Sequence, residues 1–157
     1  MLNYRIEKLK PIDYEKCANI WNMKEQSNTK KWYDEIISGN RVVFIYLIDG
    51  EFIGEGALVF KNGDPDYTIP NRRIYVSRMI VKAEYRNQGI GGAILDYLIE
   101  RAKELGYTEM ALGVDCDNIN ARHLYEKKGF TTVIYAGEDE LGRYVKLLKR
   151  IENNIAK

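Results

Sequence analysis

Apolar and polar positions along the chain follow two periods, which predict short strands alternating with amphipathic helices. Residues 4–9 alternate, as in a half-buried strand, whereas apolar side chains after residue 93 recur every three to four positions, as on the buried face of a helix. The predicted strands are residues 4–9, 41–48, 52–60, 73–81, 108–114, 130–135 and 143–148. The predicted helices are residues 11–23, 32–37, 93–105 and 119–128, the last capped by Asn118.

The order of these elements, β-α-α-β-β-β-α-β-α-β-β, predicts an α/β fold of the mixed α+β type. The chain has no internal repeat, low-complexity tract or linker, and 157 residues are an ordinary length for one domain. We therefore expect a single domain over residues 1–157, with a central mixed, mostly antiparallel sheet and helices on both faces.

A glycine-rich turn joins the predicted strand 73–81 to the helix that follows it. The turn carries Arg86 and then Gly89, Gly91 and Gly92. Glycines let a ligand approach the peptide groups closely, and a helix N-terminus offers unpaired N–H groups with a partial positive charge. The turn therefore suits a pyrophosphate, although a glycine-rich turn alone is better explained by packing.

Two common nucleotide-binding motifs do not fit this turn. A P-loop requires Gly-x-x-x-x-Gly-Lys-Ser/Thr, a string that the sequence lacks. A dinucleotide fold requires Gly-x-Gly-x-x-Gly near the start of the domain, whereas here Ile94 occupies the last position and the turn lies past the middle of the chain.

Two segments resemble the signature motifs of the GNAT superfamily of acetyl-coenzyme A-dependent N-acetyltransferases. Residues 86–92, Arg-Asn-Gln-Gly-Ile-Gly-Gly, are similar to the family's Gln/Arg-x-x-Gly-x-Gly/Ala loop. Residues 118–130, Asn-Ile-Asn-Ala-Arg-His-Leu-Tyr-Glu-Lys-Lys-Gly-Phe, are similar to its Asn-x-x-Ala-x-x-Leu-Tyr-Glu-x-x-Gly-Phe. The order of elements agrees, so the resemblance covers essentially the whole chain. It implies that strands 73–81 and 108–114 are a parallel pair that splays apart to admit the pantetheine arm.

The resemblance implies acetyl-CoA as cosubstrate. Backbone N–H groups of the loop would hold the pyrophosphate, and the backbones of Met79 and Val81 would bond the pantetheine like an added strand. Asn118 would cap its helix and is also a candidate for cofactor contact. The residues implied to bind the cofactor are Met79, Ile80, Val81, Arg86, Asn87, Gln88, Gly89, Ile90, Gly91, Gly92, Asn118 and Tyr125.

The resemblance also implies direct transfer of the acetyl group to an amine in a ternary complex. Tyr125 would protonate the departing thiolate, because a phenol with a pKa near 10 is protonated at neutral pH. The backbone N–H of Met79 would stabilise the oxyanion. Many family members place a glutamate base where this chain has Tyr75. Three candidates could replace this glutamate as the base: Glu55, Asp115 and a water chain to a backbone carbonyl. Glu55 and Asp115 are each interpreted first as an ordinary exposed carboxylate.

Cys116 lies near the expected site, but a cysteine nucleophile needs an activating base. The only histidine, His123, lies in the second motif. We interpret both as non-catalytic and, with one histidine in the chain, expect no metal site.

The implied acceptor pocket lies between the N-terminal helices, the central strands and the closing hairpin. Aromatic residues that could line it are Trp21, Trp32, Tyr33 and Tyr67. Acidic residues that could attract a cationic amine are Asp115, Asp117, Glu138, Asp139 and Glu140. Arg72, Arg73 and Arg78 favour instead an acceptor that carries a carboxylate, and the sequence leaves both alternatives open.

The amino-acid composition limits the classes of partner that the protein is expected to bind. Twenty-four basic against twenty-three acidic residues give no support for a nucleic-acid partner. No apolar run is long enough to span a membrane, the N-terminus is not a signal peptide, and Cys17 and Cys116 make no disulfide framework. We therefore expect a cytoplasmic protein without nucleic-acid or membrane partners. Family members often pair through the closing strands, which makes a homodimer an expectation as well.

The leading hypothesis is thus an N-acetyltransferase acting on a primary amine of a small molecule, amino acid or peptide. The alternative is a non-catalytic acyl-CoA-binding sensor. The missing strand glutamate favours the sensor, and the intact motif around Tyr125 opposes it.

Overall fold

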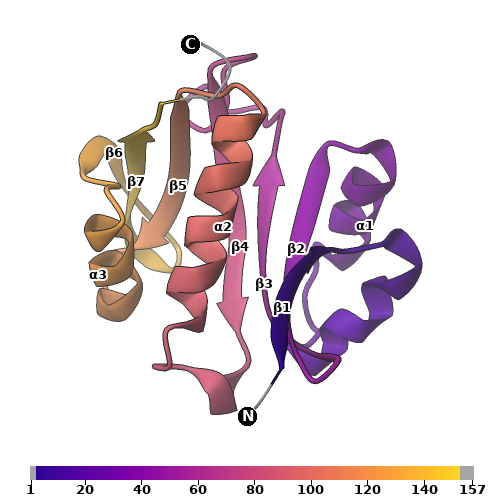
Figure 1. The fold of residues 1–157 in the computed structure, drawn as a ribbon. Helices are drawn as coiled ribbons and strands as arrows, with labels where there is room; N and C mark the ends of the chain where they lie inside the picture. Colours follow the sequence, from indigo (N-terminus) through magenta and orange to yellow (C-terminus); the bar gives the residue numbers. More distant parts are fainter. Residues whose placement is uncertain (1–2, 153–157) are drawn as a thin grey trace. The chain divides into compact units, whose positions relative to one another are not determined.

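The computed structural model describes residues 3–152 and has an α/β fold with a seven-stranded mixed sheet (Figure 1). The strands are β1 (Tyr4–Lys8), β2 (Arg41–Ile48), β3 (Glu51–Val59), β4 (Arg73–Val81), β5 (Glu109–Asp115), β6 (Thr132–Asp139) and β7 (Gly142–Arg150), in the sheet order β1-β2-β3-β4-β5-β7-β6. The helices are η1 (Pro11–Asn19), α1 (Thr29–Ser38), η2 (Ala83–Tyr85), α2 (Ile90–Glu104) and α3 (Ile119–Lys127). The pair β4–β5 is parallel, and the pairs β1–β2, β2–β3, β5–β7 and β6–β7 are antiparallel. The predicted fold class and element order are confirmed.

The described chain forms two compact units. The first takes the chain up to Val59 together with Ser77–Leu98, and the second takes Phe60–Val76 together with the chain from Ile99. β4 and α2 therefore each contribute residues to both units. The expectation of one domain over residues 1–157 stays a prediction.

In the first unit, η1 and α1 cover one face of β2 and β3 (Figure 1). Alternate strand residues point to the same face, and those of β2 and β3 pack with the helices into one apolar cluster. Its buried members are Leu9, Tyr14, Cys17, Ile20, Trp21, Ile36, Val43, Ile45, Leu47, Phe52 and Ala57.

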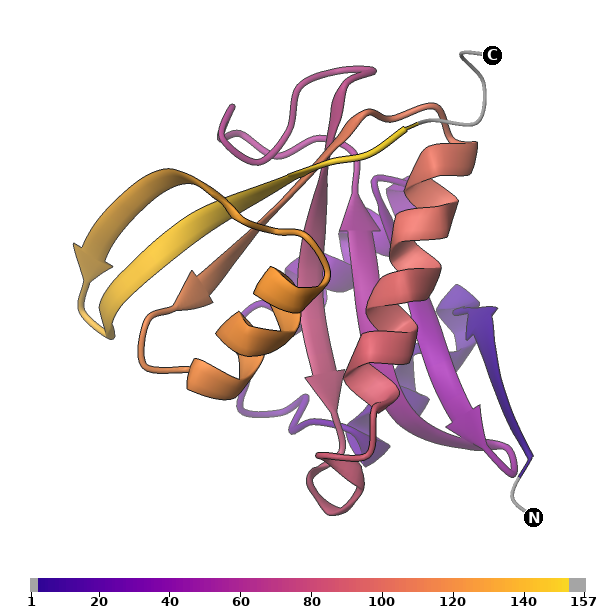
Figure 2. The same ribbon diagram turned by 60° about the vertical axis from the view of Figure 1, so that its left-hand side comes forward.

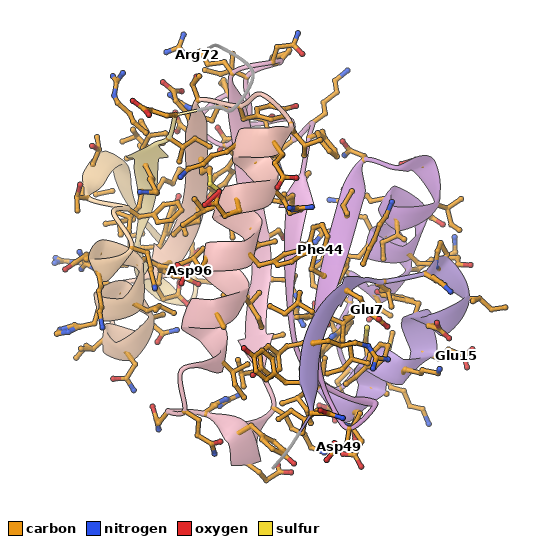
Figure 3. The ribbon with its side chains drawn as sticks, in the orientation of Figure 1. Glu7, Glu15, Phe44, Asp49, Arg72 and Asp96 are labelled. Carbon is orange, nitrogen blue, oxygen red and sulfur yellow. The ribbon has the colours of Figure 1, made fainter. Side chains whose placement is uncertain are left out.

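The opposite face of these strands packs against the first half of α2. The Phe44 ring of β2 lies 5.1 Å from the ring of Tyr97 (Figure 3). A Cβ at Gly56 of β3 would lie 2.8 Å from a side-chain carbon of Ile94. The missing side chain therefore lets helix and strand approach closely, and helices cover both faces, as predicted.

The first helix differs from its prediction. It is a 3-10 helix that ends at Asn19, rather than an α-helix to residue 23. Its apolar residues Tyr14 and Cys17, and Ile20 after it, recur every three residues, which matches the three residues per turn of a 3-10 helix. α1 also begins earlier than predicted, at Thr29.

The turn between β2 and β3, which joins the predicted strands 41–48 and 52–60, is a two-residue hairpin (Figure 3). Asp49 and Gly50 have φ of +49° and +84°. Both central residues of a type I′ turn need positive φ, and Asp-Gly is among its preferred sequences.

The second unit contains α3 and the β5–β7–β6 ladder, in which β6 and β7 form the long closing hairpin (Figure 2). Glu138 pairs with Arg143 and Asp139 with Gly142, so the turn contains only two residues. The strands predicted over residues 130–135 and 143–148 leave a longer connection, so the predicted ends of both strands at this turn were wrong. Backbone pairing extends both strands through residues whose acidic side chains are typical of turns.

β4 pairs with β5 over Arg73–Tyr75 and Glu109–Ala111. The buried carboxylate of Glu109 accepts a 2.9 Å hydrogen bond from Arg73 and lies 3.3 Å from Nε of Arg72. The splay of the two strands at their other ends stays a prediction.

The helix predicted over residues 93–105 differs at both ends. α2 begins at Ile90 and ends at Glu104, so Leu105 lies after the helix and is half exposed.

Candidate active site

The turn between β4 and α2 has the backbone geometry of an anion cradle. Asn87 and Gly89 have φ of +64° and +85°, and the first helical hydrogen bond runs from Ala93 N to Gly89 O at 3.1 Å. Between residues 87 and 92, no backbone N–H donates to another described residue. Several donors at a helix N-terminus are thus available together, the arrangement that binds phosphate groups.

The Arg86 side chain is tied to the end of β4. Its Nε donates a 2.9 Å hydrogen bond to Val81 O, while the residue as a whole is exposed. Gln88 Nε2 lies 3.4 Å from Glu84 O. The exposed guanidinium thereby adds a positive charge beside the anion cradle.

Strand β4 is irregular at Arg78, whose φ is +57°. Regular alternation would send Ser77 and Arg78 to opposite faces. Instead, Ser77 Oγ accepts a 3.1 Å hydrogen bond from Arg41, and Arg78 stacks on Trp21, so both reach the η1/α1 face. Such a local kink is typical of a β-bulge.

After this kink, Met79 points to the α2 face. Its Sδ would lie 2.8 Å from a Cβ at Gly56. Ile80 packs instead against the apolar cluster under η1 and α1. The side chains of Met79 and Ile80 are therefore both packed within the unit. The expected pantetheine contacts of the Met79 and Val81 backbones stay a prediction.

Glu55 is not the exposed carboxylate that the sequence suggested. It is 4% exposed and accepts a 2.5 Å hydrogen bond from Trp21 Nε1. Burial raises the pKa of its carboxyl, opposed by hydrogen bonds from Trp21 and Cys17 and by the charges of Arg78 and Arg41. A raised carboxyl pKa near several charges is a common feature of catalytic sites.

Arg78 lies against two indole rings close to the buried Glu55. Its guanidinium carbon is 4.5 Å from the Trp21 ring centroid and 4.6 Å from that of Trp32. Burial lowers its pKa, which the nearby Glu55 raises and Arg41 lowers further. Arg41, itself buried, is paired with Glu35 at 3.0 Å.

A hollow of about 820 Å³ lies in the first unit beside Trp21. Basic side chains at its wall are Lys24, Lys82 and Arg86, and acidic ones are Glu15 and Glu84. Its other lining residues are Ala18, Asn19, Ile20, Asn22, Met23, Thr29 and Ala83.

Tyr125 is buried in the second unit. Burial, with a smaller effect of Tyr75, raises the pKa of its phenol to about 12. Its ring packs edge-on against Phe130 at 6.2 Å, and the described residues offer its hydroxyl no hydrogen-bond partner. Such a group stays protonated throughout the neutral range.

Asn118 caps α3 as predicted, because its Oδ1 accepts a 3.3 Å hydrogen bond from Ala121 N. Asp115 lies at the end of β5 and is exposed. Cys116 is half-buried and His123 exposed, with no hydrogen bond or electrostatic interaction between them in the described part of the chain.

The predicted acidic and aromatic acceptor residues divide between the units. Trp21 and Trp32 both lie against Arg78 in the first unit, and the exposed Tyr33 contacts Tyr14 there. In the second unit, Tyr67 stacks on Tyr75 at 4.3 Å. The acidic residues of that unit, Asp115, Asp117, Glu138, Asp139 and Glu140, are all exposed.

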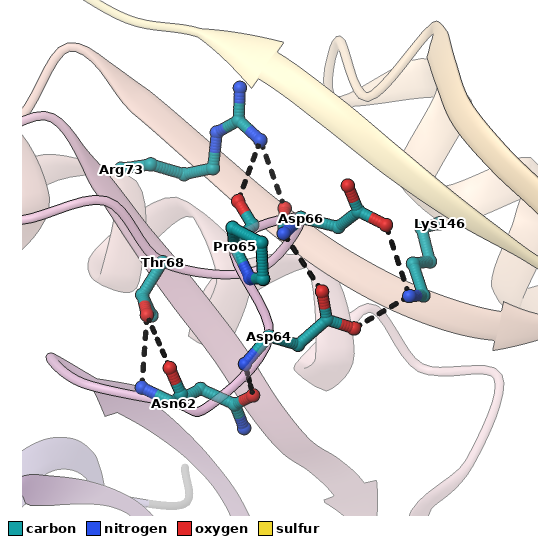
Figure 4. Close-up of polar contacts among 7 residues, drawn as sticks. All are labelled: Asn62, Asp64, Pro65, Asp66, Thr68, Arg73 and Lys146. Atoms are coloured by element: carbon teal, nitrogen blue, oxygen red, sulfur yellow. Dashed lines mark hydrogen bonds and ion pairs between the residues drawn. The ribbon is translucent and has the colours of Figure 1, made fainter.

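Tyr67 belongs to a loop that polar contacts hold against β7 (Figure 4). Lys146 Nζ donates to Asp64 at 2.6 Å and to Asp66 at 3.1 Å. Arg73 Nη1 donates to the backbone oxygen of Asp66 at 3.1 Å. The Tyr67 hydroxyl would lie 2.3 Å from a Cβ at Gly113, so the glycine makes room for it.

Sequence reasoning missed the contacts that join these residues. The burial of Glu55 could have been predicted, because it lies in the middle of a strand whose residues from Phe52 to Val59 are all buried. Nothing in the sequence pointed to Lys146 as the partner of Asp64.

None of the helices within residues 3–152 is both long and apolar enough to cross a membrane. In the same part of the chain, His, Cys, Asp and Glu side chains form no group of three or more that could hold a metal ion. A cytoplasmic location, transfer without a metal and a homodimer all stay predictions.

Comparison with known proteins finds a family model for this chain. The model of the acetyltransferase (GNAT) family matches residues 5–130. Human N-acetyltransferase 8 is 31% identical over 65 residues, which are 41% of this chain and 29% of that protein. The chain spans between 29% and 62% of the lengths of the curated relatives it matches.

Two solved structures share the fold. The ribosomal-protein-S18-alanine N-acetyltransferase from Escherichia coli superposes with a TM-score of 0.79 at 17% identity, over 99% of this chain and 98% of that one. A GNAT family acetyltransferase from Elizabethkingia anophelis, with acetyl-CoA bound, superposes with a TM-score of 0.71 at 18% identity, over 95% and 99% of the two chains.

Proposed function

This chain belongs to the acetyltransferase (GNAT) family, and we propose that it moves an acetyl group from acetyl-CoA to a primary amine of a small molecule, an amino acid or a peptide. Family membership supports acetyl-CoA-dependent acyl transfer in general. The observation that carries the proposal is the run of available backbone N–H groups between residues 87 and 92, at the N-terminus of α2.

In this proposal the β4–α2 turn binds acetyl-CoA. The N–H groups of Gln88, Gly89 and Gly91 donate to the pyrophosphate, and Arg86 supplies charge beside it. The backbones of Met79 and Val81 bond the pantetheine arm as a further strand would. Residues Ile80, Asn87, Ile90, Gly92 and Asn118 complete the proposed cofactor site.

The reaction is direct. A base removes a proton from the ammonium group, and the resulting amine attacks the thioester carbonyl. The Met79 N–H stabilises the oxyanion that forms. The C–N bond forms and the C–S bond breaks, and Tyr125 gives its proton to the departing thiolate, whose ordinary thiol pKa is near 8.5. The nitrogen releases its second proton to leave the neutral amide, and the Tyr125 phenolate takes up a proton in turn, so that one proton is released overall.

Glu55 and Asp115 are the two carboxylates proposed as the base. Burial raises the pKa of Glu55, and a base whose pKa lies nearer to neutral takes a proton from an amine more readily. Glu55 is itself enclosed, so it would act through a bridging water. We therefore place Glu55 ahead of the exposed Asp115.

The test is thiol release from acetyl-CoA with polyamines, aminoglycosides, amino acids and short peptides as acceptors. Acceptor-dependent release should fall about a hundredfold in Tyr125→Phe, the lower end expected for loss of an acid catalyst. Tyr135→Phe is the matched control, because it removes a hydroxyl from a half-exposed tyrosine of the same unit. Tight acetyl-CoA binding without release by any acceptor would favour the sensor instead.

A further inference from the structure

Glu55, Trp21, Cys17, Arg41 and Arg78 form what we call the Glu55 cluster. The guanidinium of Arg78 is the one strongly charged group of this cluster that makes no hydrogen bond or ion pair with a described residue. Its Nε is buried and has no hydrogen-bond partner in that part of the chain. It also makes no ion pair there. A guanidinium presents five N–H donors, and burying a charge without a partner is costly.

The carboxylate and the second cation of the cluster are already engaged. Glu55 accepts hydrogen bonds from Trp21 and Cys17. Arg41 is bound by Glu35 and Ser77. The cluster therefore presents Arg78 as a cation available to an outside anion.

The backbone holds Arg78 in an uncommon conformation. A φ of +57° is unfavourable for a residue with a side chain, by about 1 kcal/mol or more. Strained residues persist where the surroundings determine them, and they concentrate at binding sites. After the kink the guanidinium lies against the rings of both Trp21 and Trp32, which pack edge-on against each other with centroids 5.8 Å apart, and these contacts restrict its orientation.

The other two arginines that could recognise a carboxylate have a structural role. Arg72 and Arg73 both pair with the buried Glu109. Of the three, only Arg78 makes no ion pair with a described residue. Beside it, Trp21 also lines the hollow with the basic side chains of Lys24, Lys82 and Arg86.

We propose that Arg78, whose guanidinium lies against the rings of Trp21 and Trp32, binds a carboxylate of the acceptor, so that the acceptor is an amine that also carries a carboxylate. This inference rests on the proposed function and narrows its acceptor class to amino acids or peptides. Polyamines and aminoglycosides, which lack a carboxylate, are excluded as preferred acceptors. A planar guanidinium binds a carboxylate through two parallel hydrogen bonds, which gives both energy and orientation.

The chain offers a direct optical probe of this site. Trp21 and Trp32 are its only two tryptophans, and both contact Arg78. Intrinsic tryptophan fluorescence therefore reports on a ligand at Arg78 without any turnover. The titrants are matched pairs that differ by one carboxylate: lysine and cadaverine, arginine and agmatine, histidine and histamine, leucine and isopentylamine.

We expect at least one amino acid to change the fluorescence saturably, with an affinity about tenfold or more above that of its decarboxylated partner. Equal affinities within every pair, or no response to any carboxylate, would overturn the proposal. A dipeptide and its C-terminal amide form a further pair, which separates a peptide carboxylate from that of a free amino acid.

Two variants test whether the difference in affinity within a pair depends on Arg78. Arg78→Gln should abolish the discrimination within the pair, and Arg78→Lys should keep part of it, because a lysine retains the charge but not the two parallel donors. Arg5→Gln is the control, since it removes an exposed arginine from the same unit. Retained discrimination in Arg78→Gln would overturn the proposal, and the wild-type pairs decide it if that variant does not fold.

Thiol release with the same pairs separates this proposal from the one on which it rests. Release that is equally fast with both members of each pair would overturn the role of Arg78 and leave acetyl transfer intact. Fluorescence changes that require the carboxylate, without release from any acceptor, would overturn the transfer reaction while supporting a carboxylate site at Arg78.

Discussion

The indole N–H of Trp21 donates a 2.5 Å hydrogen bond to the carboxyl group of Glu55, across 34 positions of sequence. This bond ties the segment after η1 to the middle of β3. It also holds one of the two rings against which Arg78 stacks. Glu55 thus has two separable roles, as a support for Trp21 and as the proposed base.

Replacing Glu55 by Gln tests the second role. A glutamine keeps the oxygen that accepts from Trp21 but cannot take a proton from the substrate. We expect acetyl transfer to fall about a hundredfold or more with acetyl-CoA affinity unchanged. Glu51→Gln on the same strand is the exposed control. An unaffected rate would move the base to Asp115 or to a water chain.

The same variant has a predictable effect on stability. Because burial raises the pKa of Glu55, the folded state holds its proton more tightly than the unfolded chain does. Its contribution is complete below about pH 4 and is lost as the pH rises through the raised pKa. Urea unfolding across this range should show that loss in the wild type, and Glu55→Gln should reduce it.

The two cysteines should differ in reactivity. Cys17 is fully buried, and burial followed by the charge of Glu55 raises the pKa of its thiol. Cys116 is only partly buried. Because the thiolate is the reactive form, DTNB should titrate one thiol in the folded protein and both in denaturant. Two rapidly reacting thiols without denaturant would contradict the buried environment of Cys17.

The turn that precedes α2 provides a test of cofactor binding. Gly89 has a φ of +85° with open space around it, and so does Gly39, with a φ of +84°, at the end of α1. Alanine at either position costs a similar backbone strain of about 1 kcal/mol. We expect Gly89→Ala to weaken acetyl-CoA binding about tenfold and Gly39→Ala to leave it unchanged, as measured by calorimetry. Equal affinities in the two variants would remove Gly89 from the cofactor site.

Local pattern predicted the elements whose period is regular. The β2–β3 hairpin followed from apolar runs around Asp49-Gly50, and the buried face of α2 from Ile94, Leu95 and Leu98. The sequence predicted an α-helix in place of the 3-10 helix η1. Apolar residues recur every three positions in a 3-10 helix and every three to four in an α-helix, and so short a segment does not distinguish the two.

The candidate site was harder to predict, because its geometry depends on tertiary contacts. The positive φ of Arg78 has no local signal, since arginine has no preference for that conformation. The bond between Trp21 and Glu55 joins positions that only the packed sheet brings together. Motifs located the turn at Arg86–Gly92 and the helix of Tyr125, but not the charge pairing that leaves Arg78 available.

Gly113 and Tyr67 are expected to be coupled in the second unit. A Cβ at Gly113 would lie 2.3 Å from the Tyr67 hydroxyl but 3.4 Å from the ring carbon that carries it. Gly113→Ala should therefore lower the free energy of unfolding by about 1–3 kcal/mol, as overpacking does. In a Tyr67→Phe background the same substitution should cost much less. Equal costs in the two backgrounds, measured by urea unfolding, would show that the hydroxyl does not lie against Gly113.

The ion pair between Asp64 and Lys146 should stabilise the protein only above the acid range. The hydrogen bond from Lys146, with one from the backbone of Asp66, lowers the pKa of the Asp64 carboxyl. Its contribution is therefore present above the unfolded pKa near 3.9 and is lost as the pH falls through the lowered value. Asp64→Asn keeps the oxygen that accepts from Asp66 but removes the charge, and should cost about 1 kcal/mol at neutral pH.

That difference between wild type and Asp64→Asn should shrink toward zero as the pH is lowered, because the wild-type carboxyl then becomes neutral too. Urea unfolding at a series of acidic pH values measures it directly. Asp117→Asn, at an exposed aspartate of the same unit, is the matched control and should change stability little at any pH. A cost for Asp64→Asn that stays constant into the acid range would mean that the loop is held by the neutral contacts of Asn62 and Thr68 rather than by charge (Figure 4).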